Sequence, residues 1–183
     1  PPGQRPEYYP VVWPAPVNER NLRAQGFDLA AEPVRHEAME RARDTGLPAL
    51  SGKVALIGDI ANPVPGFVYF QAIYARGQPL ATTEERRRAI IGFVFCPFRV
   101  ADLMQGVIGK ERDVLDTEVY DGGAPTASGL MYDDDGVAHA LEPGLRPAHW
   151  WQRQVRHGGR TWTLHFEASP GYLRQIDSPT PRW

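Results

Sequence analysis

Few residues in this 183-residue sequence have a type and spacing that would support catalysis. The single cysteine, Cys96, lies between Phe95 and Pro97 in an apolar segment, where burial would disfavour the reactive thiolate. We therefore expect Cys96 to be a small core residue and the domain not to be an enzyme. A small hydrolase with a cysteine or histidine at its centre is the weaker alternative. The sequence also contains no glycine-rich phosphate motif and no G-x-S-x-G nucleophile elbow.

The sequence contains no clear metal-binding motif either. The five histidines show none of the spacings typical of a metal site: His36, His139, His149, His157 and His165. Zinc needs three or four ligands in a defined geometry. The run 133–135 followed by Gly136 resembles part of a calcium loop, but it lacks the spaced oxygen ligands and the distal glutamate. We interpret it as a solvated hairpin turn and predict neither a metal nor a cofactor.

Asp28 is the strongest candidate for a binding residue. It stands between Phe27 and Leu29, just before a predicted helix. A buried carboxylate must accept hydrogen bonds or be paired with a cation. Two interpretations remain open at this point: Asp28 caps a helix or local turn, or it accepts hydrogen bonds from the N–H groups of a small ligand.

The elements that must position these residues are short helices and strands. The sequence predicts a helix that begins near Pro33 and ends at Gly46, with Val34, Ala38 and Ala42 on one apolar stripe. We predict a second helix over 100–108, a hairpin turn at 157–159, and strands over 8–13, 50–57, 67–74, 90–98, 113–120, 129–132, 149–155 and 160–167. The strand at 67–74 is apolar enough to be a central strand buried on both faces, and 90–98 is predicted to be another buried strand.

Polar residues 81–89 separate two blocks, 1–80 and 90–183, which we interpret as subdomains joined by a linker. Each block combines a few antiparallel strands with a covering helix, so the expected fold class is α+β. The net charge of −2 argues against a nucleic-acid partner. No apolar run is long enough for a membrane span or a signal peptide, and a start at Pro1 without methionine suggests a piece of a longer protein.

Several short segments occur in a recognisable order: Tyr8–Val11, Asn18, Gly26–Leu29, Arg41–Gly46, Ile73–Tyr74, Gly92–Phe95 and Pro97–Arg99. In this order they resemble the CHASE domain, the cyclase- and histidine-kinase-associated sensory extracellular family, over about residues 7–109. The resemblance implies the periplasmic, extracytoplasmic sensor of a bacterial inner-membrane receptor. Such a sensor is homodimeric, is flanked by transmembrane helices and is coupled to a cytoplasmic histidine kinase or cyclase.

The resemblance also implies tandem PAS-like subdomains behind an N-terminal stalk helix, which we expect to lie outside this piece of the protein. The membrane-distal subdomain, 1–80, would bind a small organic ligand, and 90–183 would be membrane-proximal. In the plant cytokinin-receptor branch, an aspartate matching Asp28 accepts hydrogen bonds from an adenine group, and backbone matching Leu50 adds a contact. Phe70 stands where that branch has a small threonine, so an adenine-sized ligand should clash.

Trp13 and Tyr69 complete the candidate ligand site, and the ligand's identity is left open. The alternative is a ligand-free structural or interaction module of such a receptor, in which Phe70 fills the cavity.

Overall fold

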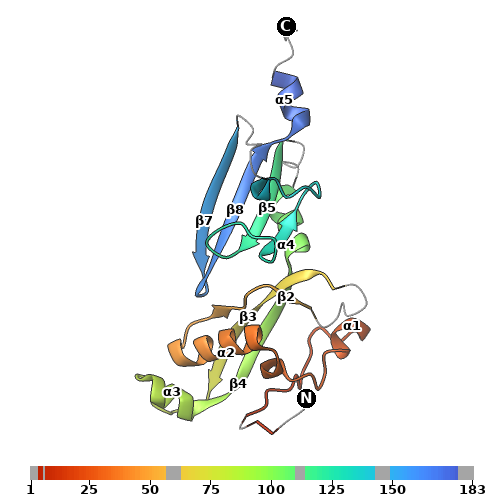
Figure 1. Cartoon of the computed structure of the whole chain (residues 1–183). Coiled ribbons are helices and arrows are strands. Elements are labelled where there is room, and N and C mark those ends of the chain that lie inside the picture. Colours follow the sequence, from red (N-terminus) through yellow and green to blue (C-terminus); the bar gives the residue numbers. More distant parts are fainter. Residues whose placement is uncertain (1–3, 6, 57–62, 110–113, 143–148, 177–183) are drawn as a thin grey trace. The chain divides into compact units, whose positions relative to one another are not determined.

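The structure is a computed structural model that describes residues 4–5, 7–56, 63–109, 114–142 and 149–176 (Figure 1). The chain divides into two compact units. The first comprises the residues up to Arg99 together with His157–Arg160, and the second comprises Val100–Arg156 and the residues from Thr161 onward. Both units contain an antiparallel sheet and helices, which confirms the predicted α+β class and is consistent with PAS-like subdomains. Within the described ranges, no helix combines the length and apolar character needed to cross a membrane.

The first unit is built around one long strand. Its elements are α1 (Glu19–Leu22), η1 (Leu29–Ala31), α2 (Pro33–Thr45), β1 (Ala49–Leu50), β2 (Val54–Ala55), β3 (Pro65–Tyr74), α3 (Thr83–Ala89) and β4 (Ile90–Arg99). Strands β1, β2 and β4 all pair antiparallel with β3. The prediction that 67–74 is a central strand is therefore confirmed, whereas the predicted strand 50–57 consists of two short strands.

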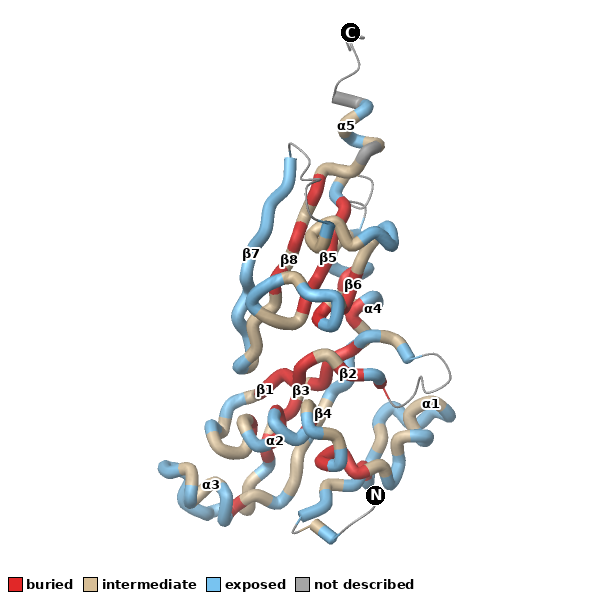
Figure 2. The backbone as a smooth tube through the Cα atoms, in the orientation of Figure 1, coloured by how far each residue is buried: buried red, intermediate tan, exposed pale blue. Residues whose placement is uncertain are grey.

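Helix α2 packs on one face of this sheet and supplies much of the core of the first unit (Figure 2). The side chain of Glu32 accepts hydrogen bonds from the first free backbone N–H groups of the helix, and Pro33 occupies its first turn, where no donor is lost. Gly46 ends the helix with a φ of 73°, a left-handed conformation that favours glycine. The predicted boundaries of this helix are confirmed. The core contains Val11, Leu29, Ala30, Ala38, Met39, Ala42, Ala49, Val54, Leu56, Val68 and Phe70.

Residues 8–13 do not form the predicted strand. Pro10 makes only an isolated antiparallel bridge with Asp28. Proline lacks the N–H that a ladder needs, and Pro14 and Pro16 follow closely, so the pairing cannot extend. The segment is nevertheless held in place, because the backbone N–H of Val11 donates to the carbonyl of Phe27 at 2.9 Å.

Residues 81–99 also differ from the prediction. The proposed linker contains helix α3, which Thr82 and Glu85 begin with a capping box. Strand β4 then pairs along β3, with Phe95 opposite Phe70, so the chain divides after Arg99 and not at 81–89. The prediction that 90–98 is a buried strand was wrong: Val94 and Cys96 are exposed. An apolar run does not reveal which of its faces another element will cover.

The second unit has a four-stranded antiparallel sheet. Its elements are α4 (Val100–Ile108), β5 (Leu115–Asp121), β6 (Leu130–Asp133), η4 (His139–Leu141), β7 (Trp150–His157), β8 (Arg160–Ala168) and α5 (Pro170–Ile176). The strand order is β6-β5-β8-β7, which confirms the four predicted strands and the helix at 100–108. Strand β7 is exposed along its length, whereas β5 is largely buried (Figure 2). Gly158 and Gly159 have φ values of 54° and 75°, as a tight hairpin turn requires.

Candidate functional site

Asp28 is buried, with 8% of its surface exposed, and both of its carboxylate oxygens are engaged. Oδ1 accepts hydrogen bonds from the backbone N–H groups of Tyr9 at 2.9 Å and Ala30 at 3.1 Å, and Oδ2 is ion-paired with the guanidinium of Arg5. Burial acts to raise the pKa of Asp28, but these hydrogen bonds and the charge of Arg5 outweigh it and hold the pKa below its usual value. The capping interpretation of Asp28 is confirmed, because it caps η1.

Aromatic rings connect Asp28 to the sheet. The ring of Tyr9 meets Phe93 edge-on with centroids 5.2 Å apart, and Phe93 meets Phe70 edge-on at 6.3 Å. Phe70 is fully buried in the core. Asp28 and Phe70 therefore lie on the α2 side of the sheet, with packed rings between them.

The other predicted ligand residues lie elsewhere. Leu50 is paired with Tyr69, whose side chain points to the sheet face opposite Phe70 because neighbours on a strand alternate. The backbone N–H of Leu50 donates to Gly158 at 2.9 Å, and Tyr69 stacks on His157. Trp13 is 83% exposed. The structure thus brings Asp28 and Phe70 to one side of the sheet and Leu50 and Tyr69 to the other.

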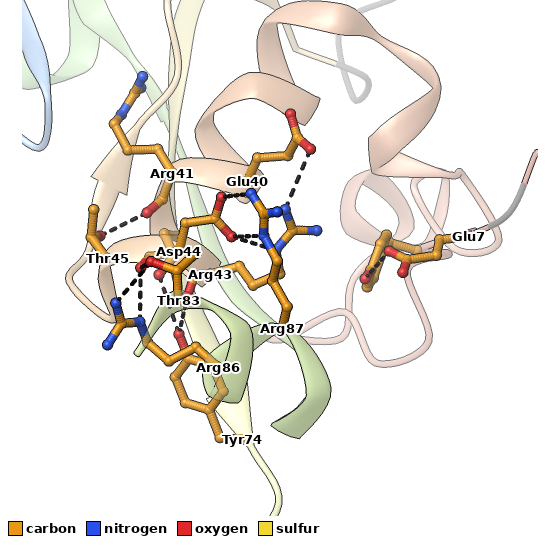
Figure 3. Close-up of polar contacts among 12 residues, drawn as sticks. Glu7, Glu40, Arg41, Arg43, Asp44, Thr45, Tyr74, Thr83, Arg86 and Arg87 are labelled. Atoms are coloured by element: carbon orange, nitrogen blue, oxygen red, sulfur yellow. Dashed lines mark hydrogen bonds and ion pairs between the residues drawn. The ribbon is translucent and has the colours of Figure 1, made fainter. Parts of the chain in front are cut away.

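A charged network in the first unit joins the end of α2 to α3 (Figure 3). The carboxylate of Asp44 accepts from Arg43 Nε at 2.8 Å and from Arg87 Nε at 2.9 Å, and these hydrogen bonds lower the pKa of Asp44 strongly. The carbonyl of Asp44 accepts from Arg86 at 2.7 Å, and the Tyr74 hydroxyl donates to the carbonyl of Arg43 at 2.6 Å. All of these groups are satisfied by one another, so we assign the network a structural role.

The second unit contains a partly buried polar cluster that the sequence did not reveal: Asp116, Glu118, His165 and Glu167 are buried, Asp133 and His139 are half-buried, and Asp135 is exposed. It consists of five carboxylates and two imidazoles: Asp116, Glu118, Asp133, Asp135, His139, His165 and Glu167. In the register of β5 and β8, Asp116 lies opposite Glu167 and Glu118 lies opposite His165, so all four side chains share one sheet face. The sequence does carry one sign of this cluster, since polar residues occupy every second position along parts of β5 and β8. Alternating polar residues ordinarily predict a solvent-exposed face, whereas here they are buried.

Residues 135–140 bring further polar groups to this face. His139 Nε2 lies 3.3 Å from Asp135 Oδ2 and 3.7 Å from Asp116 Oδ2, and its Nδ1 lies 3.9 Å from Glu167 Oε2. The backbone N–H of Ala140 donates to the carboxylate of Glu118 at 3.2 Å. Chemically, these groups can exchange protons or coordinate a cation.

The pKa values of this cluster reflect crowded carboxylates. Burial, together with the charge of Asp135, raises the pKa of Asp116 to about 6. For His139, burial acts to lower the pKa, but the hydrogen bond to Asp135 and the charges of Glu167 and Asp116 leave it above its usual value. The run 133–135 ends in an exposed bend, where Asp133 accepts from the backbone N–H groups of Asp135 and Gly136, and Asp135 also faces His139.

Comparison with known proteins gives two findings. The family model of the CHASE domain matches residues 1–132, which extends the similarity beyond the predicted limit at 109. The chain is also 28% identical over 184 residues to hybrid signal transduction histidine kinase A of Dictyostelium discoideum, covering 89% of this chain. It spans only 8% of the length of that relative. Because the family model covers well over half of the sequence, this chain belongs to the CHASE domain family and is a sensory module of a signalling receptor.

Proposed function

We propose that this CHASE domain is the extracytoplasmic, small-molecule-sensing part of a membrane receptor, as the resemblance implies. In this proposal the domain is non-catalytic, and the receptor pairs as a homodimer through transmembrane helices that flank the sensor. Its output is a cytoplasmic enzyme of the histidine kinase or cyclase type. The name of the Dictyostelium relative, a hybrid histidine kinase, favours the kinase.

The ion pair between Arg5 and Asp28 is the observation that carries the ligand proposal. Two backbone N–H groups hold Oδ1 of Asp28, whereas a single side chain holds Oδ2. The Arg5 side chain is 28% exposed, so solvent reaches it. A small ligand with a cationic or N–H donor can replace Arg5 at Oδ2 and leave both backbone hydrogen bonds intact.

Phe70 limits the size of that ligand. Its ring is fully buried and contacts Phe93 and Phe95. Moving the ring aside for a ligand would disrupt the packing of the core. The proposal therefore favours a ligand smaller than an adenine derivative, bound beside Asp28 and not in the space that the ring of Phe70 fills. Binding would act on the receptor by favouring one of two arrangements of its sensor, with a coupling of about 1–3 kcal/mol.

A thermal-shift and calorimetric screen tests the ligand proposal. The panel contains amines, amino acids, organic acids and purines, and we expect donors smaller than purines to bind the wild-type chain. Asp28→Asn retains an oxygen for Tyr9 and Ala30 but presents an amide where Oδ2 now accepts. We expect this variant to lose at least about tenfold in affinity, equivalent to about 1.4 kcal/mol. Equal binding by wild type and variant would refute the role of Asp28.

Cys96 offers a test of location. It is exposed, and it is the only cysteine of this chain. We expect a membrane-impermeant maleimide to label it in intact cells that make the full-length receptor, and the Cys96→Ser variant to lose that labelling. Labelling of Cys96 only after the cells are lysed would contradict an extracytoplasmic location.

The second candidate function is a ligand-free structural or interaction module. The full engagement of the Asp28 oxygens and the complete burial of Phe70 favour it. A screen without any hit, together with unchanged receptor output in the Asp28→Asn variant, would select this alternative over ligand sensing.

A further inference from the structure

We propose that Asp116, Asp135 and His139 form a binding site for a divalent transition-metal ion, with Zn²⁺ as the reference ion. This site lies in the second unit and is independent of the ligand proposed at Asp28.

The first observation is uncompensated negative charge. The polar cluster holds five carboxylates and two imidazoles, and three of the carboxylates, Asp116, Glu118 and Glu167, are buried. In the part of the chain that the structure describes, no arginine or lysine forms an ion pair with the cluster. Removing carboxylates from water is costly unless they are paired, protonated or bound to a cation. A divalent cation would supply the missing positive charge.

The second observation concerns Asp116 itself. Only 6% of its surface is exposed, and neither of its carboxylate oxygens has a hydrogen-bond partner. Buried polar atoms are almost always hydrogen-bonded, so an unpartnered pair of oxygens points to a missing group. Oδ2 of Asp116 faces Nε2 of His139 at 3.7 Å, which is too long for a hydrogen bond.

The third observation is the spacing of the donor atoms. One atom from each of the three residues lies within 4.8 Å of the others, and His139 Nε2 lies 3.3 Å from Asp135 Oδ2. Two ligands of a tetrahedral zinc ion, each bound at about 2.0–2.2 Å, lie about 3.3–3.6 Å apart. A small movement of Asp116 therefore brings all three donors to one ion.

The surroundings of His139 match a metal-binding histidine. Its Nε2 faces the two aspartates, while its Nδ1 is directed toward Glu167 Oε2 at 3.9 Å, a distance that must shorten by about 1 Å on metal binding to form a hydrogen bond. Glu167 is fixed in turn by His165, whose Nε2 lies 2.7 Å from Oε1. Metal-bound histidines commonly direct their second ring nitrogen at a carboxylate, which fixes the ring and strengthens it as a ligand.

The donor set also selects the kind of ion. Calcium and magnesium prefer ligand shells made entirely of oxygen, whereas an imidazole with carboxylates suits zinc and similar transition metals. Three protein ligands leave a fourth position for water or an exchangeable group. Bound metal would fasten residues 135–139 to β5 and neutralise part of the cluster.

Calorimetry with Zn²⁺ on the EDTA-treated, dialysed chain tests the proposal, supported by the visible spectrum of the Co²⁺-loaded protein. We expect one site, a four- or five-coordinate Co²⁺ spectrum, and a rise in Tm of about 5–10 °C at saturating Zn²⁺. Asp116→Asn and His139→Ala should each weaken Zn²⁺ binding more than about tenfold, while Mg²⁺ should have no effect.

Two matched controls distinguish this site from adventitious binding. Asp134→Asn changes the neighbouring aspartate, whose side chain accepts from the Tyr132 hydroxyl, and His36→Ala removes an exposed imidazole of the first unit. Both should bind Zn²⁺ as the wild type does. Circular dichroism in EDTA checks that each variant is folded. The Co²⁺ spectrum of the wild type reports the coordination geometry of the site even if a variant fails to fold. Absence of Zn²⁺ binding, an octahedral Co²⁺ spectrum, or unchanged affinity in Asp116→Asn and His139→Ala would overturn the proposal.

Discussion

The backbone N–H of Tyr9 donates to Oδ1 of Asp28 at 2.9 Å, across a sequence separation of 19 residues. This bond attaches the extended N-terminal segment to the residues that lead into α2. Asp28 therefore has a structural task besides the binding role proposed for it, and the two tasks use different oxygens.

Substitutions at Asp28 should separate these tasks. Asp28→Ala leaves the N–H groups of Tyr9 and Ala30 without their acceptor, so we expect it to lower the free energy of unfolding by about 2 kcal/mol. Asp28→Asn retains that acceptor and should cost less than about 1 kcal/mol. Urea denaturation of both variants measures the difference, and equal losses would show that the Oδ1 hydrogen bonds contribute little.

Removing Arg5 should improve ligand binding. If Arg5 competes with the ligand for Oδ2, then Arg5→Ala frees this oxygen, and the affinity for a cationic or N–H donor should rise about two- to fivefold, the equivalent of one partly exposed ion pair. Calorimetry with a ligand from the screen measures this change, with Arg23→Ala as the matched control for lost positive charge. A fall in affinity on Arg5→Ala would mean that Arg5 helps to bind the ligand.

Asp44 should make the first unit sensitive to acid. Hydrogen bonds from Arg87 and Arg43 lower its pKa in the folded state, whereas its unfolded pKa is about 3.9. Its stabilising effect is therefore fully present above the unfolded pKa and is lost as the pH falls through the folded value. Urea denaturation from pH 7 downward should show a smaller acid-dependent loss in Asp44→Asn than in wild type. Parallel curves for the two proteins would contradict this linkage.

The turn glycines should differ in their tolerance of alanine. Gly158 has a φ of 54°, and a Cβ there would lie 2.8 Å from the backbone nitrogen of Leu50. Gly136 also has a positive φ, of 86°, but a Cβ there would meet nothing within 4 Å. Gly136→Ala should therefore cost only the conformational penalty of about 1–2 kcal/mol, and Gly158→Ala clearly more. Thermal unfolding compares the two, and equal losses would show that Leu50 can move aside.

Local sequence signals correctly predicted the elements whose boundaries depend on nearby residues. Pro33 and Gly46 delimit α2, and the glycines at 158 and 159 form the predicted hairpin turn, because caps and positive φ angles are decided within a few residues. The order of short segments likewise identified the family over the part of the chain that it covered.

Which faces are buried depends on partners distant in sequence. Phe70 pairs with Phe95, so β4 joins the first sheet, and Cys96 is exposed although its neighbours are apolar. Asp116 and Glu167, 51 positions apart, become opposite neighbours in β5 and β8, and a polar alternation typical of a solvent face is buried instead. The sequence by itself determined the family and those elements whose ends are set by caps and turns, such as α2 and the hairpin at 158 and 159, because these follow from local order. Only the tertiary structure decided which side chains meet, because strand pairing and coverage depend on contacts that local periodicity does not encode.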